Sequence, residues 1–120
     1  MKHYFLVAAA LGLSACNTVP DAVDLDTEVG GNYQALADCV YVDFTDRTFP
    51  MMVIKVELPS QSLSRLQIGA NSSIIGELDF IDQGDTRTRV TLRHQRAIYG
   101  KDFYADRYMK SIDRCAAQLG

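Results

Sequence analysis

Two segments of alternating apolar and polar residues, 72–81 and 86–98, flank the short sequence Asp82-Gln83-Gly84. Alternation with a period of two is typical of a strand that buries one face. A three-residue hairpin connection favours glycine at its last position, which takes a left-handed conformation. The stretch therefore predicts an antiparallel β-hairpin, and this limits the chain to folds that contain an antiparallel sheet.

The expected turn also predicts which residues of the two strands face one another, because it places Ile81 opposite Asp85. Counting back from that pair, opposite charges meet on one face of the hairpin: Glu77 with Arg89, and Asp79 with Arg87. On the other face the pairs are apolar or small: Ile74 with Leu92, Gly76 with Val90, and Leu78 with Thr88. A shift by one residue would destroy both sets of matches.

Two further segments have the pattern of strands. Residues 52–58 form an alternating run that ends before Pro59, and this favours a half-buried strand made of Met52, Val53, Ile54, Lys55, Val56, Glu57 and Leu58. Residues 65–68 are less regular, and we interpret them as a short strand with Leu66 and Ile68 facing inward. Together with the hairpin, these segments predict a sheet of three or four strands.

Helical spacing of apolar residues appears on both sides of the strands. In residues 32–44 one helix face would carry Tyr33, Leu36, Ala37, Val40 and Phe44, with Asn32 as the N-cap. A second helix would begin near Asp102 and bury Tyr104, Tyr108, Ile112, Cys115 and Leu119. The sequence thus predicts a two-layer α+β domain in which N-terminal and C-terminal helices cover one face of an antiparallel sheet, in the order α-β-β-β-β-α.

The first residues of the chain have the pattern of an export signal. Lys2 and His3 precede a ten-residue apolar run, about half the length that a membrane-spanning helix requires. The run ends in Leu13-Ser14-Ala15-Cys16, which resembles the lipobox of bacterial lipoproteins. The resemblance implies that residues 1–15 are removed as a signal peptide and that Cys16 carries acyl chains, the lipidation site. The alternative is an ordinary secretory peptide, which would leave Cys16 as an unpaired thiol.

The lipobox resemblance also implies a location. Several acyl chains on one residue anchor a protein stably to a membrane surface. Asn17 follows the cysteine, and in the enterobacterial sorting rule the absence of aspartate at that place favours the outer membrane, with the domain in the periplasm. Residues 16–30 contain four acids and no base, so we interpret them as the lipidated cysteine and a flexible acidic tether, followed by the domain at 31–120.

Once Cys16 is set aside, two cysteines remain, Cys39 and Cys115. Exported proteins meet oxidising conditions, so we expect a disulfide bond between them that joins the two helices. A metal site is the alternative. Two cysteines and the single histidine of the mature chain do not have the spacing of a zinc site, and we predict neither a metal nor a cofactor.

The charge of the domain restricts the partners that it can bind. Residues 31–120 hold eleven Lys and Arg and eleven Asp and Glu, so the domain is close to neutral. Proteins that bind nucleic acid normally have a basic excess, and we expect no nucleic-acid partner.

A basic row on the second hairpin strand is the candidate partner-binding site. Arg87, Arg89 and Arg93 alternate along one side of this strand, and Gln95 continues the row. The expected register pairs Arg87 and Arg89 with acids, which leaves Arg93 and Gln95 as the stronger candidates for contact. The alternative is an ordinary solvated sheet face.

No set of residues in the sequence has the arrangement of a catalytic site. A general base needs a nucleophile or an orienting carboxylate beside it, and His94 has no such residue near it in the sequence. We interpret His94 as a partly buried residue that hydrogen-bonds a neighbour, and we assign no catalytic residues.

These expectations favour a non-enzymatic envelope lipoprotein, an accessory or protein-binding module tethered to the outer membrane by Cys16, with an envelope protein as its partner. Two alternatives stay open. One is an inhibitor or ligand-binding lipoprotein that uses the exposed sheet face around Arg93 and Gln95. The other is a small cell-wall hydrolase, which would require His94 or a pair of carboxylates.

Overall fold

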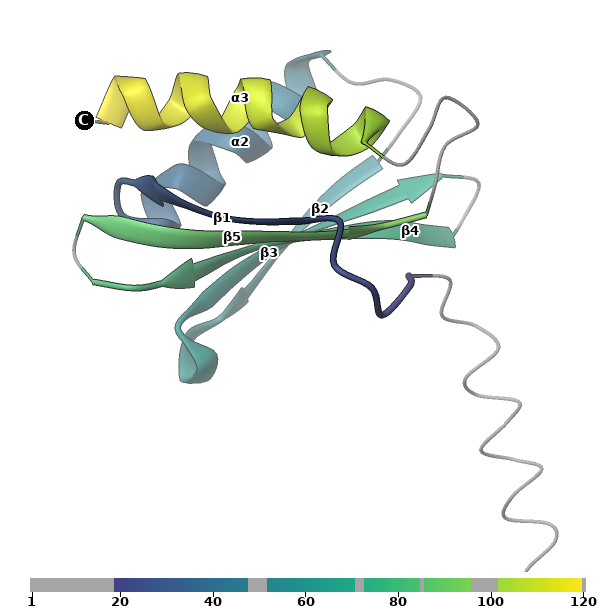
Figure 1. The fold of residues 1–120 in the computed structure, drawn as a ribbon, viewed down its shortest axis with the longest axis horizontal. Helices are drawn as coiled ribbons and strands as arrows, with labels where there is room; N and C mark the ends of the chain where they lie inside the picture. The colour runs from purple at the N-terminus through teal and green to yellow at the C-terminus, as the bar shows by residue number, and fades with distance from the viewer. Residues whose placement is uncertain (1–18, 48–51, 71–72, 85, 96–101, 120) are drawn as a thin grey trace, which may run out of the picture.

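The computed structural model describes residues 19–47, 52–70, 73–84, 86–95 and 102–119. These residues form one five-stranded antiparallel sheet and two helices, so the expected α+β class is confirmed (Figure 1). In chain order the elements are β1 (Leu25–Gly30), α2 (Tyr33–Arg47), β2 (Met52–Leu58), the short 3-10 helix η1 (Pro59–Gln61), β3 (Leu63–Ala70), β4 (Ser73–Asp82), β5 (Arg87–His94) and α3 (Phe103–Leu119).

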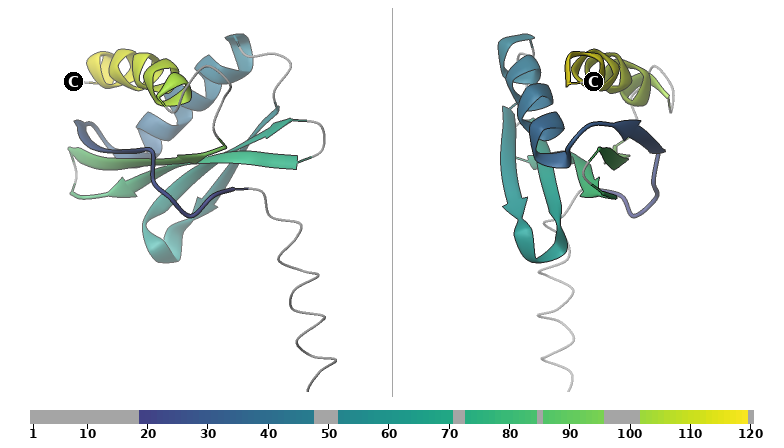
Figure 2. Two further views of the ribbon diagram at one scale, coloured as in Figure 1. Left: turned by 45° about the vertical axis from the view of Figure 1, so that its right-hand side comes forward. Right: turned by 90° about the vertical axis from the view of Figure 1, so that its left-hand side faces the viewer.

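The strands lie in the order β1-β5-β4-β3-β2, and each neighbouring pair is antiparallel. Both helices cover the same face of this sheet, which we call the inner face (Figure 1). The sheet is strongly twisted, so β2 and β3 run in a different direction from β1 and β5 (Figure 2). The opposite face, which we call the outer face, carries neither α2 nor α3.

Strand β1 corrects the interpretation of the acidic segment. Leu25–Gly30 lies within the stretch expected to be a flexible tether, but it pairs with β5 along its whole length. Its residues alternate in exposure, with Asp26 and Glu28 on the outer face. Because the described residues form five strands, the expectation of three or four strands is wrong. The expected order is also wrong at its start, because β1 precedes the first helix of the described residues.

Helix α2 begins where the sequence predicts, because Asn32 caps it. The side-chain oxygen of Asn32 accepts hydrogen bonds from the backbone N–H groups of Gln34 (3.0 Å) and Ala35 (3.1 Å), which have no partner within the helix. The apolar stripe of the helix packs against inner-face residues of β3, β4 and β5. This core contains Leu36, Ala37, Val40, Phe44, Leu66, Ile68, Leu78, Phe80, Val90 and Leu92.

Helix α3 packs beside α2, and a disulfide bond joins them. The expected bond between Cys39 and Cys115 is present, with the two Cα atoms 5.9 Å apart. Tyr108, Ile112 and Cys115 are buried as the spacing predicts, whereas Leu119 is exposed. Asp43 of α2 adds a polar link, because its carboxylate accepts hydrogen bonds from Ser111 and Arg114 of α3.

Strand β2 has its two sides reversed relative to the usual pattern. An alternating strand normally buries its apolar row, but Met52 and Ile54 are 66% and 46% exposed on the outer face. The inner-face row contains Lys55, which forms an ion pair with Asp38 of α2, and Glu57, which accepts a hydrogen bond from Ser64 (2.6 Å). The polar row therefore finds partners under the helix, and the apolar row stays outside.

The β4–β5 hairpin has the expected faces but not the expected pairs. Glu77 lies opposite Arg93 rather than Arg89, and Leu78 lies opposite Leu92 rather than Thr88. The chain reverses two residues later than expected, and the N–H of Gln83 donates to the carbonyl of Arg87 (3.1 Å). Because this shift of four residues along β5 is even, the side chains from Gly76 to Asp79 stay on their predicted faces. Ile74, expected to face inward, is instead 36% exposed, because the register shifts between Ile68 and Gly69.

Candidate partner-binding face

The outer face of the sheet is the candidate site, because it carries the predicted arginines and neither α2 nor α3 covers it. Arg87, Arg89 and Arg93 extend from this side of β5, as the alternation predicts. Each of them forms an ion pair with a carboxylate of a neighbouring strand. The basic row of the sequence is therefore a network of paired charges that spans the sheet.

Two of the pairs join β5 to β1. Arg89 donates two hydrogen bonds to the carboxylate of Asp26, at 2.9 and 2.6 Å. Arg87 binds Glu28 in the same two-point manner, at 3.2 and 2.8 Å. The expected partners, Glu77 and Asp79, are wrong for both arginines, because β1 supplies the acids that the sequence interpretation assigned to a tether.

The centre of the outer face holds a more buried group of charges on β3, β4 and β5. Arg65 donates to Asp79 (2.8 and 3.1 Å), and its Nε also lies 2.9 Å from Glu77. Arg93 donates to the same oxygen of Glu77, Oε2, at 2.8 Å. Only 9% of Glu77 and 8% of Asp79 is exposed. Arg93, expected to have no acidic partner, thus belongs to a four-residue cluster in which two arginines and two carboxylates balance.

The pairing shifts the titration of the groups involved. Hydrogen bonds from Arg89 lower the pKa of Asp26, although desolvation opposes this effect. Arg87 lowers the pKa of Glu28 in the same way. The hydrogen bonds to Asp79 raise the pKa of Arg65 despite its partial burial. These groups therefore stay charged near neutral pH, and the face keeps its alternating pattern of positive and negative groups.

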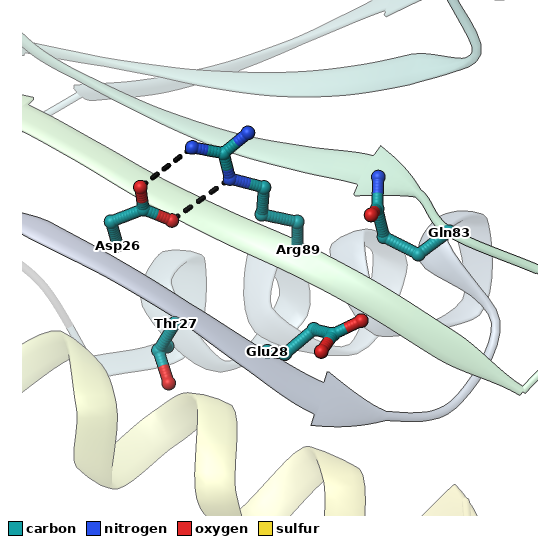
Figure 3. A pocket seen from close by; sticks show the side chains of 5 residues that line it. All are labelled: Asp26, Thr27, Glu28, Gln83 and Arg89. Atoms are coloured by element: carbon teal, nitrogen blue, oxygen red, sulfur yellow. Dashed lines mark hydrogen bonds and ion pairs between the residues drawn. The ribbon is translucent and has the colours of Figure 1, made fainter.

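A shallow depression of about 460 Å³ lies at the β1–β5 side of this face. Figure 3 shows Asp26 and Arg89 bound to each other above the two strands, with Gln83 beside them and Thr27 pointing the opposite way, toward the helices. The lining of the depression is polar, and it contains the complete ion pair between Asp26 and Arg89. Such a surface offers hydrogen-bonding groups to a partner without an unbalanced charge.

An apolar row borders the charged network along β2. The row consists of Met52, Ile54, Val56 and Leu58, of which the first two are largely exposed and the other two half-buried. Singly scattered apolar residues are normal on a surface, but neighbouring ones mark contact sites. The outer face thus combines an apolar margin with a charged centre, and the alternation of β2 indicated the apolar row but not that it faces outward.

His94 is the last residue of β5 and Gln95 follows it, and the two have different surroundings. Gln95 is exposed, and its N–H donates to the carbonyl of Ile75 (2.9 Å). His94 is 2% exposed and points to the inner face. Its Nδ1 lies 2.7 Å from the carbonyl of Gln95, and its Nε2 lies 3.2 Å from the hydroxyl of Tyr108. The expected contact with a neighbour is present, and the residue is more fully buried than predicted.

The environment of His94 favours the neutral imidazole. Nδ1 donates to a carbonyl, so Nε2 is left to accept the hydrogen bond from Tyr108. Burial lowers the pKa of His94, and the contact with Gln95 and the charge of Asp24 oppose this shift only in part. The ring also stacks on Tyr104, with the ring centres 3.8 Å apart. Both nitrogens are engaged, so this geometry does not offer His94 to a substrate as a general base.

Three other sequence expectations concern binding or anchoring. Cys16 lies outside the described residues. Among the residues that the structure describes, no three His, Cys, Asp or Glu side chains group as metal ligands would. Within the same residues, neither helix has the length and apolar character that crossing a bilayer requires.

Comparisons of the chain with protein-family models, with curated proteins and with solved structures found no match. The function is therefore argued from the geometry of the outer face and from the lipobox-like sequence.

Proposed function

We propose that this protein is a lipid-anchored accessory module of a bacterial cell envelope, which binds a protein partner through the outer face of its sheet. It is not an enzyme in this proposal. Cys16 carries the acyl chains, residues 17–24 span the distance from the membrane, and the domain lies in the periplasm at the outer membrane.

One observation carries the proposal: the face opposite the helices combines exposed apolar residues of β2 with a network of paired charges. Protein interfaces likewise combine apolar contacts with polar groups, and on this face the apolar row lies at one margin, beside the charged centre. Met52 and Ile54 provide the apolar contacts. Arg87, Arg89 and their carboxylates provide a pattern of alternating signs that only a complementary partner can match.

The disulfide bond agrees with the proposed location. A bond between Cys39 and Cys115 persists in oxidising compartments such as the periplasm and is rare in the cytosol. The lipobox-like sequence Leu13-Ser14-Ala15-Cys16 supplies the anchor in this proposal. A variant with Cys16→Ser is expected to leave the membrane fraction. If it fractionates with membranes as the parent chain does, the anchor is not at Cys16.

A second candidate function is an inhibitor or ligand-binding lipoprotein, and the depression beside Asp26 and Arg89 favours it. Its polar lining suits a hydrophilic ligand or a polar loop of a target protein. Such a lipoprotein would bind one soluble partner tightly, and Arg89→Glu would abolish that binding by opposing Asp26.

The test of the proposed face is photo-crosslinking in cells from position 91. Thr91 lies on the outer face between Asp79 and Asp26, and replacing it breaks no ion pair. The control places the same crosslinker at Asp113, an exposed position on α3. We expect one abundant envelope protein to be captured from position 91 and not from position 113.

Equal capture from both positions would contradict an outer-face docking site, as would a set of unrelated neighbours. Capture from position 113 alone would move the interface to the helical side. The captured partner then needs a direct assay, in which Arg89→Glu weakens binding of the purified domain more than the exposed helix change Lys110→Glu does.

A further inference from the structure

Strand β2 is an edge of the sheet whose charged residues, Lys55 and Glu57, lie on the inner face and whose outer-face row is wholly apolar. Within the described part of the chain, β2 pairs only with β3. Edge strands expose backbone N–H and C=O groups that can pair with another strand, and proteins usually protect them with charged side chains. The other edge, β1, carries Asp26 and Glu28 on its outer face, whereas β2 carries only apolar residues there.

The symmetry of a pair of sheets limits how two copies of β2 can meet. Antiparallel pairing of identical strands places a two-fold axis perpendicular to the sheet. Residues directly opposite each other share a face, so the axis must pass through a residue and not between two residues. The available centres in the middle of β2 are Ile54, Lys55, Val56 and Glu57.

The charges of the inner-face row of β2 determine which of these four residues can lie on the two-fold axis. A centre at Lys55 places two lysines opposite each other, and a centre at Glu57 places two glutamates opposite each other, which is destabilising. A centre at Ile54 leaves Lys55 opposite the partner's Val53. Only a centre at Val56 sets Lys55 opposite the partner's Glu57, and it does so twice.

The outer-face row fits the same centre. With Val56 on the axis, Ile54 lies opposite the partner's Leu58, and the two Val56 side chains face each other. Apolar pairs of this kind stabilise neighbouring strands. The overlap covers residues 54–58 of both copies and ends where Pro59, which has no N–H, turns the chain into η1.

We propose that two copies of this chain pair through β2, in an antiparallel register centred on Val56, and that the two sheets become one continuous sheet. The exposed apolar rows of both copies then join into a single strip on the outer face. Lys55 keeps its contact with Asp38 and gains the partner's Glu57 in addition to its own Glu57 at 3.6 Å. The dimer does not depend on the envelope function proposed above, because pairing at the edge leaves the outer face uncovered.

The register is tested by single cysteines in the full chain carrying Cys16→Ser, whose other two cysteines are already bonded to each other. Under mild oxidation, Val56→Cys is expected to form a covalent dimer rapidly, because residue 56 lies opposite itself. Ile54→Cys and Leu58→Cys are each expected to crosslink poorly alone and to crosslink with each other when mixed. Efficient crosslinking of Ile54→Cys alone, or none at Val56→Cys, would overturn the register.

The dimer itself is tested by sedimentation velocity on the purified chain with Cys16→Ser. We expect the parent chain to sediment as a dimer and Ile54→Lys as a monomer. Leu119→Lys is the matched control, because Leu119 at the end of α3 is exposed to a similar degree (44%, against 46% for Ile54) and lies beside Gly30, at the opposite edge of the sheet; this variant should stay dimeric. A parent chain that is monomeric at all concentrations, or a dimer that Leu119→Lys dissociates as readily, would refute pairing through β2.

Discussion

The close approach of Gly76 to His94 gives the sharpest prediction for the stability of this domain. The two residues are directly opposite in the β4–β5 pair. A Cβ atom added at Gly76 would lie 2.2 Å from Cδ2 of His94 and 2.9 Å from Cγ, well inside van der Waals contact. The ring cannot turn aside easily, because Tyr108 holds its Nε2 and Tyr104 stacks on its face.

We therefore expect Gly76→Ala to lower the free energy of unfolding. Overpacking of a rigid core typically costs about 1–3 kcal/mol, and displacing the ring also loses its hydrogen bond to Tyr108, about 1 kcal/mol. The lower flexibility of the unfolded chain returns about 0.4–1 kcal/mol. The net cost is about 1–4 kcal/mol, or a fall in Tm on the order of 5–30 °C for a domain of this size. Urea denaturation and calorimetry measure it directly.

A double-mutant cycle separates this steric clash from any general destabilisation that alanine causes in the sheet. In a His94→Ala background the ring is gone, and Gly76→Ala is expected to be neutral or stabilising. Gly30→Ala is the matched control, because its added Cβ has only one neighbour, at 3.9 Å. If Gly76→Ala costs as much without the histidine as with it, or if Gly30→Ala costs the same, the steric reasoning is wrong.

Three further predictions concern the disulfide, the buried histidine and the charged network. Replacing Cys39 and Cys115 by serine opens a loop of 76 residues, and is expected to cost about 4–5 kcal/mol of stability in urea denaturation; a cost below about 1 kcal/mol would contradict the bridge as a major stabiliser. Burial lowers the pKa of His94 in the folded state below its unfolded value of about 6.5. As the pH falls, the unfolded state therefore binds the proton first. The contribution of His94 to stability is full above about pH 6.5 and falls as the pH drops toward the folded pKa. His94→Gln should remove this slope between pH 5 and 7, and an unchanged slope would refute the assignment. Arg65→Gln leaves two nearly buried carboxylates without their shared donor, and it is expected to lower the free energy of unfolding by about 2 kcal/mol. The control Arg87→Gln, at an exposed ion pair, should change the unfolding midpoint little. Equal effects of the two changes would show that burial of the ion pair does not matter here.

The sequence predicted best those elements whose evidence is local. Both helices, the cap at Asn32 and the inward residues Leu66 and Ile68 depend on spacing within one segment, and the structure confirms them. The disulfide was also predictable, because only two cysteines remained to pair. Strand β1 was not predicted, because the acidic composition of this segment indicated a flexible tether. Leu25, Thr27 and Val29 nevertheless alternate with Asp26 and Glu28 as in a half-buried strand.

Strand β2 shows why alternation does not reveal which row is buried. The alternation of residues 52–58 is clear, but the inner positions at this edge lie beside the polar residue Asp38 of α2. Lys55 finds a charged partner there and Glu57 finds Ser64, so the usual cost of an inward charge is offset. These partners lie 17 and 7 residues away in the sequence, outside β2, so the pattern of the strand itself does not show which row is buried.

The pairing of charges on the outer face could not be predicted from the pattern of one strand either, and this bears on function. Shifting β5 by four residues keeps every side chain on its face and still sets Glu77 opposite an arginine, so patterning cannot distinguish Arg89 from Arg93 as its partner. The choice depends on where the turn falls and on β1, which brings Asp26 and Glu28 to the other arginines. A row of arginines read from one strand therefore says little about the charge of the finished face. Here it is balanced pair by pair, and a partner must match the positions of both signs rather than a positive field.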